Sequence, residues 1–143
     1  MRAIDTDVLV RLITRDDERR TAAAEEFVAA GAWVSHLVLV EAMWVLTTVY
    51  ELSKDKIATA VQMLLKHADL TLHDSDVVAA AVARYRRRTA PQFSDCMIMH
   101  IARKAGHLPL GHSTAPLARW RARSASSIKP YRRPPLNCLM GGR

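Results

Sequence analysis

The sequence has few cysteines and no long apolar run. Its two cysteines, Cys96 and Cys138, show neither a CxxC motif nor a Cys/His spacing typical of zinc sites, so a disulfide framework is excluded and a reducing compartment is favoured. No apolar stretch reaches the roughly 18 residues that a spanning helix needs. The N-terminus also lacks the basic, apolar and small-residue order of a signal peptide. We therefore expect a soluble, cytoplasmic protein.

Acidic residues are absent from the last part of the chain. The net charge is +7 over 143 residues, yet positions 1–110 carry 14 Lys and Arg against 14 Asp and Glu, while positions 111–143 carry 7 basic residues and no acidic one. The whole excess lies in this tail, which is also rich in proline, serine and arginine. We expect residues 1–110 to form one domain and residues 111–143 to be disordered or poorly packed.

Strand-like and helix-like segments alternate along the first 110 residues. Positions 2–10 predict a buried strand that ends in Val-Leu-Val and projects Asp5 and Asp7 to the same side. Further strands are expected at 32–35, 70–72 and 107–110, and helices at 19–30, about 38–49, 53–67, 74–85 and 95–105. This alternation predicts an α/β/α sandwich with a largely parallel sheet.

Three acids stand at the ends of these expected elements. Asp5 lies near the end of the first strand, Glu41 in the helix after the second, and Asp95 at the start of the last helix. Sites in parallel sheets gather at the carboxyl ends of the strands, so we expect the three carboxylates to converge. Oxygen ligands select Mg²⁺ or Mn²⁺, which can activate water for phosphodiester hydrolysis.

Three segments carry a resemblance to a known family. The stretches MRAIDTDVLVRLI, WVSHLVLVEAMWVL and PQFSDCMIMHIARKAG are similar, in this order, to the motif regions of PIN-domain ribonucleases of the VapC toxin type. The resemblance covers about the first 110 residues. It implies a PIN-like fold and a Mg²⁺-dependent endoribonuclease. It also implies an RNA substrate, a VapB-type antitoxin as partner, and a homodimer.

The resemblance also implies roles for single residues. Asp5 and Asp95 would hold the metal, and Glu41 would complete the cluster and orient the attacking water. Asp7 stands where the family often has Asn, and Gln92 where many members have an accessory acid. The six histidines show no HExxH motif and no close pairing along the chain, so we expect them in core or surface positions.

The tail departs from the family at the point where a Thr-Phe-Asp-Arg-like motif with a fourth acid usually follows. One permitted coding of residues 111–125, read one base earlier, spells Thr-Phe-Asp-Arg-Ala-Leu-Gly-Lys-Val-Glu-Gly-Ala-Gln-Arg. Our hypothesis is that a one-base deletion near Gly111 placed the tail out of frame and left the PIN domain incomplete. The codons around Ser113 and Thr114 test it.

Other interpretations stay open at this stage. Each acid could instead cap a helix or a turn. Without the fourth acid, the chain could be a catalytically impaired PIN-fold protein that binds antitoxin or RNA without cleaving. The pair Asp5 and Asp7 also suggests a phosphatase of the haloacid dehalogenase type, although no convincing downstream lysine and acidic pair is present.

Overall fold

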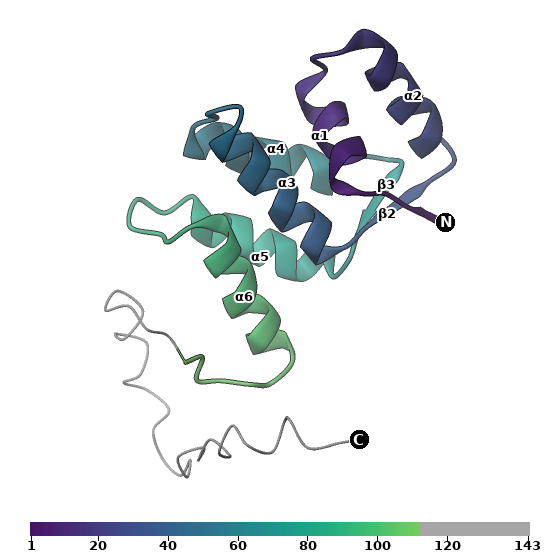
Figure 1. Cartoon of the computed structure of the whole chain (residues 1–143). Helices are drawn as coiled ribbons and strands as arrows, with labels where there is room; N and C mark the ends of the chain where they lie inside the picture. The colour runs from purple at the N-terminus through teal and green to yellow at the C-terminus, as the bar shows by residue number, and fades with distance from the viewer. Residues whose placement is uncertain (112–143) are drawn as a thin grey trace, which may run out of the picture. The chain divides into compact units, whose positions relative to one another are not determined.

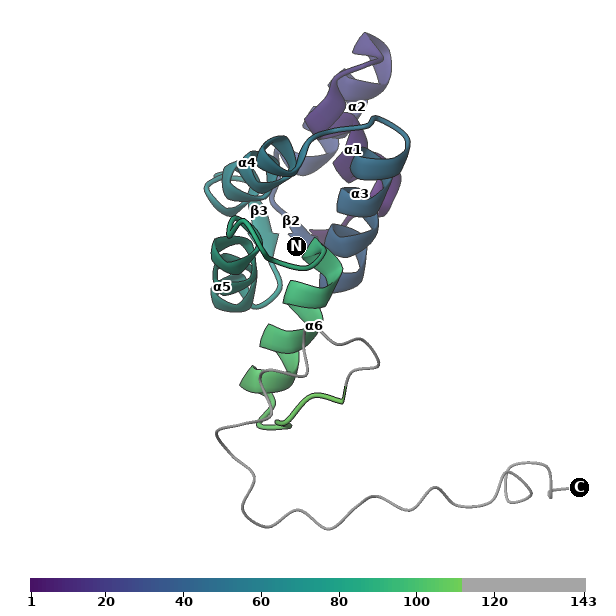
Figure 2. The same cartoon turned by 90° about the vertical axis from the view of Figure 1, so that its left-hand side faces the viewer.

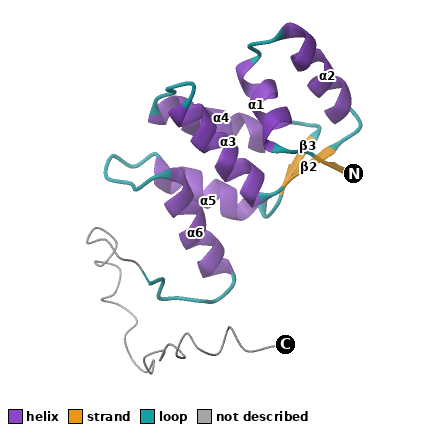
Figure 3. Cartoon of the chain, in the orientation of Figure 1, coloured by secondary structure: helices purple, strands orange, loops and turns teal. Residues whose placement is uncertain are grey.

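Three short strands and six helices alternate along residues 1–111, the part of the chain that the computed structural model describes. Figure 1 shows their order along the chain, and Figure 3 shows how small the sheet is beside the helices. The elements are β1 (Arg2–Ala3), α1 (Thr6–Thr14), α2 (Glu18–Val28), β2 (Ala32–Val34), α3 (His36–Thr48), α4 (Lys54–Leu65), β3 (Leu70–Leu72), α5 (Ser75–Tyr85) and α6 (Phe93–Lys104).

The sheet is parallel throughout, with strand order β1-β2-β3. Arg2 pairs with Ala32, and Ala32 in turn pairs with Leu70. Parallel neighbours need crossover connections, and here each crossover contains two helices, α1 with α2 and then α3 with α4. Figure 2 shows the strands between α1 and α3 on one side and α4 and α5 on the other. The predicted α/β/α class is therefore confirmed.

Four helices begin at a residue that caps them. The side chains of Asp5, Asp17, Ser35 and Ser53 each accept a hydrogen bond from the backbone N–H three residues later. Such a cap contributes about 1 kcal/mol, since it satisfies a donor that the helix leaves unpaired. The predictions of helices near 19–30 and 53–67, and of strands near 32–35 and 70–72, are confirmed.

One continuous core holds these elements together. It contains fully buried side chains from α1, α3, α4 and α6, among them Leu9, Leu39, Leu46, Ile57 and Met97. Helix α6 packs against α5 and also against α3. The rings of Tyr85 and Phe93 meet edge to face at 5.7 Å between centroids, which joins the end of α5 to the start of α6.

The prediction of a strand over Val8, Leu9 and Val10 is wrong. These residues lie in α1, and the strand before them is only two residues long. A short apolar run is compatible with either a strand or a buried helix, and the acid at the N-cap decides for the helix here. Leu9 and Val10 are buried, as the strand prediction required, but they are buried on a helix that packs against α3.

The prediction of a strand at 107–110 is also wrong, because these residues are irregular. Helix α6 ends in a turn where Gly106 has a positive φ of 77° and the His107 N–H donates to the Ala102 carbonyl at 2.9 Å. Pro109 then lacks the N–H that a strand ladder uses. Within residues 1–111, no segment pairs with 107–110. The predictions for positions 112–143 fall on residues outside the described part of the chain.

The last two helices begin differently from the predictions. Helix α6 starts at Phe93 and not at Asp95. Helix α5 starts at Ser75, one residue after the predicted start, and its N-cap Asp74 makes no side-chain capping hydrogen bond. No helix within residues 1–111 is long and apolar enough to cross a membrane.

Candidate active site

Asp5 occupies the point where β1 gives way to α1. The Ile4 N–H still donates to the Trp33 carbonyl at 3.1 Å, which continues the pairing of β1 with β2. One residue later, the Asp5 carboxylate accepts from the Val8 N–H at 3.0 Å as the N-cap of α1. The side chain is exposed. Asp5 therefore stands at the carboxyl end of the sheet, as a site residue should, although at a helix start and not inside a strand.

The strand alternation expected for Asp5 and Asp7 does not hold. We expected both acids to point the same way along a strand, but Asp7 is the second residue of α1 and Asp5 is the extended N-cap before it. The period of two that would place both side chains on one face applies only within a strand. Asp7 is exposed and its carboxylate lies 3.6 Å from the guanidinium of Arg11, one helical turn on. This contact stabilises α1 slightly and gives Asp7 an ordinary structural role.

Glu41 reaches the same end of α1 from α3. The Thr6 hydroxyl, next to Asp5, donates to Glu41 Oε2 at 2.6 Å. Helices α1 and α3 pack against each other, which brings Thr6 and Glu41 within reach. We expected apolar neighbours to leave little polar surface around Glu41, yet its side chain is exposed, while Ala42 and Met43 beside it are buried. The hydrogen bond fixes Glu41 near the residue that follows Asp5.

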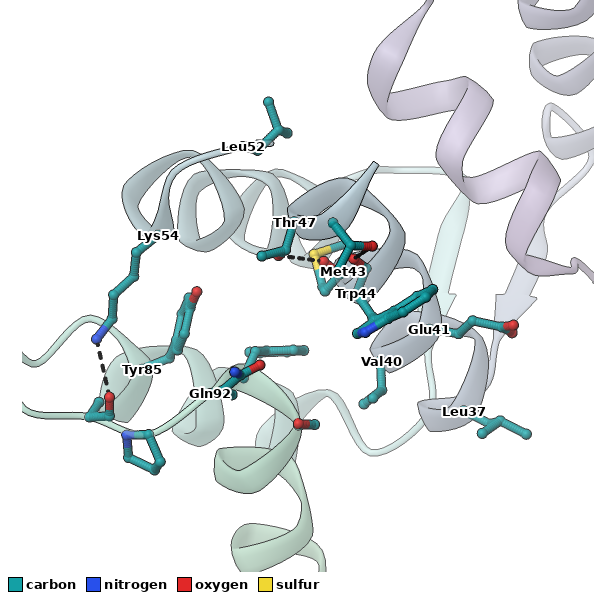
Figure 4. Close-up of a pocket in the computed structure, with 15 residues that line it drawn as sticks. Leu37, Val40, Glu41, Met43, Trp44, Thr47, Leu52, Lys54, Tyr85 and Gln92 are labelled. Carbon is teal, nitrogen blue, oxygen red and sulfur yellow. Dashed lines mark hydrogen bonds between the residues drawn. The ribbon is translucent and has the colours of Figure 1, made fainter. Parts of the chain in front are cut away.

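Asp95 lies in the first turn of α6 and is half-buried. The N-cap of this helix is Gln92, which makes no capping hydrogen bond through its side chain. Gln92 and Ser94 line a groove of about 980 Å³ that Glu41 also borders. Figure 4 shows Glu41 at one end of this groove, Gln92 near its middle, and Lys54 with Tyr85 at the far end. Asp95 thus follows directly in sequence after Ser94, which lines the same groove as Glu41.

The three acids fit a hard cation by their chemistry, since all offer carboxylate oxygens. The three carboxylates are arranged openly and not as a tight cluster. Among the described residues, they do not form a group whose ligand atoms all lie within 4.8 Å of one another. Mg²⁺ keeps several waters and is commonly held by one or two carboxylates, so this open arrangement suits an ion bound partly through water.

A different group does gather at this distance. His36, His73 and Asp74 each offer a ligand atom, and the three atoms lie within 4.8 Å of one another. We expected the histidines in core or surface positions without pairing, but the rings of His36 and His73 have centroids only 4.7 Å apart. The sequence did contain a signal: His36 follows shortly after Val34, and His73 follows Leu72, at the ends of two strands that pair in parallel.

Apolar side chains are exposed beside Glu41. Leu37 is 76% exposed and Trp44 is 60% exposed, and both line the groove together with the half-buried Val40. Figure 4 shows these side chains on the same helix as Glu41. An exposed apolar surface of this kind marks an interaction site more often than an isolated exposed residue does.

A small parallel sheet between helices, with acids where its strands end, defines an α/β protein whose chemistry is expected at the carboxyl edge of the sheet. A family model described as PIN domain matches residues 3–107, so the chain belongs to the PIN domain family. PIN domains are generally nucleases, typically use divalent metal ions, and often act as toxins in toxin–antitoxin systems. A search of curated proteins and a search of solved structures each gave no match.

Proposed function

We propose that this PIN domain is a Mg²⁺-dependent endoribonuclease, the toxin of a VapBC-type toxin–antitoxin system. The observation that carries the proposal is the hydrogen bond between Thr6 and Glu41. It brings the acid of α3 to the residue beside Asp5, at the carboxyl end of the sheet of a PIN domain. This supports a site that combines Glu41 with Asp5, which is distant in the sequence, at the edge where parallel α/β sheets carry their chemistry.

The proposed roles follow from position. Asp5 and Asp95 hold the metal, and Glu41 orients the attacking water. When bound, the metal lowers the pKa of that water and neutralises charge on the phosphodiester. The chain's own side chains fix the geometry: the Val8 N–H holds Asp5, and the Thr6 hydroxyl holds Glu41. Mn²⁺ has a similar preference for oxygen ligands and could replace Mg²⁺.

The proposed partners are an RNA substrate, a VapB-type antitoxin and a second copy of the chain. The exposed apolar side chains of Leu37 and Trp44 support a protein partner, because they would be buried by a segment that enters the groove beside Glu41. Such a segment would also keep RNA from the carboxylates. The cytoplasm is the proposed location.

We also propose that the tail is out of frame, and this proposal leads to a second candidate function. The family's fourth acid is missing after Gly111 in the present reading frame. Loss of this acid would weaken the binding of a second ion or the water shell of the first. The second candidate is therefore a catalytically impaired protein that still binds antitoxin or RNA. The nucleotide sequence of the gene tests the deletion: codons at Ser113 and Thr114 that cannot give GAC one base earlier would exclude it.

The first experiment measures cleavage of RNA by the purified full chain with and without Mg²⁺ or Mn²⁺. Asp5→Asn removes one carboxylate charge and should lower the metal-dependent rate by at least about 100-fold. Asp69→Asn is the matched control, because Asp69 is an exposed acid just before β3, at the amino edge of the sheet. Equal cleavage by both variants would contradict the site.

A second chain separates an impaired enzyme from a wrong assignment. In this chain the sequence after position 110 is replaced by the in-frame reading Thr-Phe-Asp-Arg-Ala-Leu. Metal-dependent cleavage that appears only in the restored chain, and disappears with Asp5→Asn, favours the catalytically impaired reading. Absence of cleavage by both chains on unstructured RNA would overturn the nuclease proposal.

A further inference from the structure

The carboxyl ends of β2 and β3 bring together two histidines and an aspartate. Val34 pairs with Leu72 in register, and the His73 N–H extends the ladder by donating to the Val34 carbonyl at 2.9 Å. His36 lies two residues beyond Val34 and begins α3, directly after its N-cap Ser35. The parallel pairing therefore places His36 beside His73 and Asp74, with ligand atoms of all three within 4.8 Å of one another.

The backbone of Asp74 is held in an unfavourable conformation at this point. Its φ of 46° and ψ of 59° lie in the left-handed region, which costs a non-glycine residue free energy. Asp74 does not recover this cost by capping α5, since it makes no capping hydrogen bond. Its side chain instead points to the histidines: Asp74 Oδ2 lies 3.7 Å from His73 Nε2.

A lysine holds the other oxygen of the same carboxylate. Lys104 Nζ donates to Asp74 Oδ1 and to Asp76 Oδ1, both at 2.8 Å. Asp74 Oδ1 is thus occupied and Oδ2 is turned toward the rings. An outer partner of this kind orients a metal ligand in many sites. The positive charge of Lys104 opposes a dication, but two carboxylates share that charge and offset much of the repulsion.

His36 contributes a polar atom that needs a partner. Its Nε2 is buried, and among the described residues it has no hydrogen-bond partner. A buried polar atom without a partner destabilises the fold, because it has lost its hydrogen bonds to water. Burial, and then the charge of His73, lowers the pKa of His36, which favours the neutral imidazole. A neutral imidazole is the form that binds a metal.

We propose that His36, His73 and Asp74 form a metal site for a borderline first-row divalent ion such as Zn²⁺. Two imidazoles and one carboxylate suit such ions, whereas Mg²⁺ prefers oxygen ligands alone. Bonds of about 2.0–2.2 Å would place the three ligand atoms about 3.4 Å apart, so small side-chain rotations from the present separations suffice. Three protein ligands leave a fourth position for water. The proposal does not rest on the nuclease function.

Binding of Zn²⁺ to the untagged full chain tests this site. The chain is first stripped with a chelator and then titrated calorimetrically with Zn²⁺ in a large excess of Mg²⁺, which occupies sites made only of oxygen. We expect one Zn²⁺ per chain at these residues and a higher Tm in its presence, because a ligand bound only to the folded state stabilises it. Co²⁺ in place of Zn²⁺ should give visible absorption bands.

Two variants identify the ligands, and one serves as control. His73→Ala removes an exposed ligand, and Asp74→Asn removes a charge while keeping a residue that tolerates the left-handed backbone. Each should weaken Zn²⁺ binding at least about tenfold and abolish the Co²⁺ bands. His107→Ala, which removes an exposed histidine elsewhere, should bind as the unchanged chain does.

The same measurements can overturn the site. If the unchanged chain binds no Zn²⁺, or if His73→Ala binds it with the same affinity, these residues do not hold the ion. The second result would assign any binding to another histidine or to a cysteine. Equal Tm values of His73→Ala and the unchanged chain in chelator establish that the variant is folded.

Discussion

Two groups of side chains occupy one edge of the same small sheet, and they differ in what they offer a metal. After β1, Asp5 and Glu41 are exposed, and Glu41 accepts a hydrogen bond from the hydroxyl of Thr6, the residue after Asp5, while Asp95 comes from α6. After β2 and β3, His36, His73 and Asp74 gather closely, with one imidazole nitrogen buried. The first group suits a hydrated hard ion, and the second suits an ion that binds nitrogen directly.

The difference shows that the position in the fold does not fix the chemistry. Both groups lie where parallel strands end, and α3 contributes to both, with His36 at its first residue and Glu41 one and a half turns later. Donor type and burial then separate them. Four changes, ordered from the largest expected effect to the smallest, test how independent the two groups are.

Leu39→Ala should weaken both groups together. Leu39 lies in α3 between His36 and Glu41 and is 1% exposed. Removal of a buried leucine side chain lowers the free energy of unfolding by about 2–5 kcal/mol, since a cavity remains. Chemical denaturation measures the loss. A loss below about 0.5 kcal/mol would mean that α3 is not the common support of the two groups.

Asp95→Asn should affect only the acidic group. We expect metal-dependent RNA cleavage to fall at least about 100-fold, with Zn²⁺ binding unchanged. Asp55→Asn is the matched control, because Asp55 also lies in the first turn of a helix. Both changes remove a similar favourable interaction with the helix dipole, of about 0.3–1 kcal/mol. Equal cleavage rates of the two variants would reduce Asp95 to an ordinary first-turn acid. The restored chain is used if the natural one is inactive.

Thr6→Val should have a smaller effect on cleavage, because Thr6 only positions Glu41. The variant keeps the shape of the side chain but loses the 2.6 Å hydrogen bond to Glu41 Oε2. We expect cleavage to fall by about 3–10-fold, in line with the loss of one solvent-exposed hydrogen bond of about 0.5–1.5 kcal/mol. Thr6→Ser keeps the hydroxyl and should restore the rate. A positioning role would be contradicted if Thr6→Ser were as slow as Thr6→Val.

Asp16→Asn should leave both metal groups unchanged and alter only the pH dependence of stability. The hydroxyl of Tyr50, and then Arg11, lower the pKa of Asp16 to about 2 from an ordinary value of 3.8. An acid whose pKa is lowered by folding stabilises the fold above its unfolded pKa. This contribution is therefore present at neutral pH and is lost as the pH falls from about 4 to about 2.

Unfolding of the unchanged chain and of Asp16→Asn, measured across this pH range, checks the prediction. The two curves should differ at pH 7 and converge near pH 2. Curves that run parallel through the whole range would show that the contacts of Asp16 do not depend on its charge.

The sequence predicted most of the fold because local signals were strong. Helices were expected near 19–30 and 53–67, and strands near 32–35 and 70–72, and the structure has an element of the expected kind at each place. It failed at Val8 to Val10, where three apolar residues fit a strand as well as a helix. It failed again at 107–110, because a strand needs a neighbouring strand to pair with, and within residues 1–111 none pairs with this segment.

The candidate sites were also predictable only in part from the sequence. The identities of Asp5, Glu41 and Asp95 came from motif order, and their roles stay predictions. The contact of Glu41 with Thr6 required the packing of α1 on α3. His36 and His73 were not predicted as partners, because they are far apart along the chain and no local pattern links them.

The sequence by itself determined the class of fold and the family resemblance, since periodicity, caps and motif order are local properties. Only the tertiary structure decided which side chains meet. The register of β2 with β3 brings His73 beside His36, and the packing of α1 on α3 brings Glu41 to Thr6. Both contacts join residues that are about 35 positions apart, and only the folded chain brings such residues together.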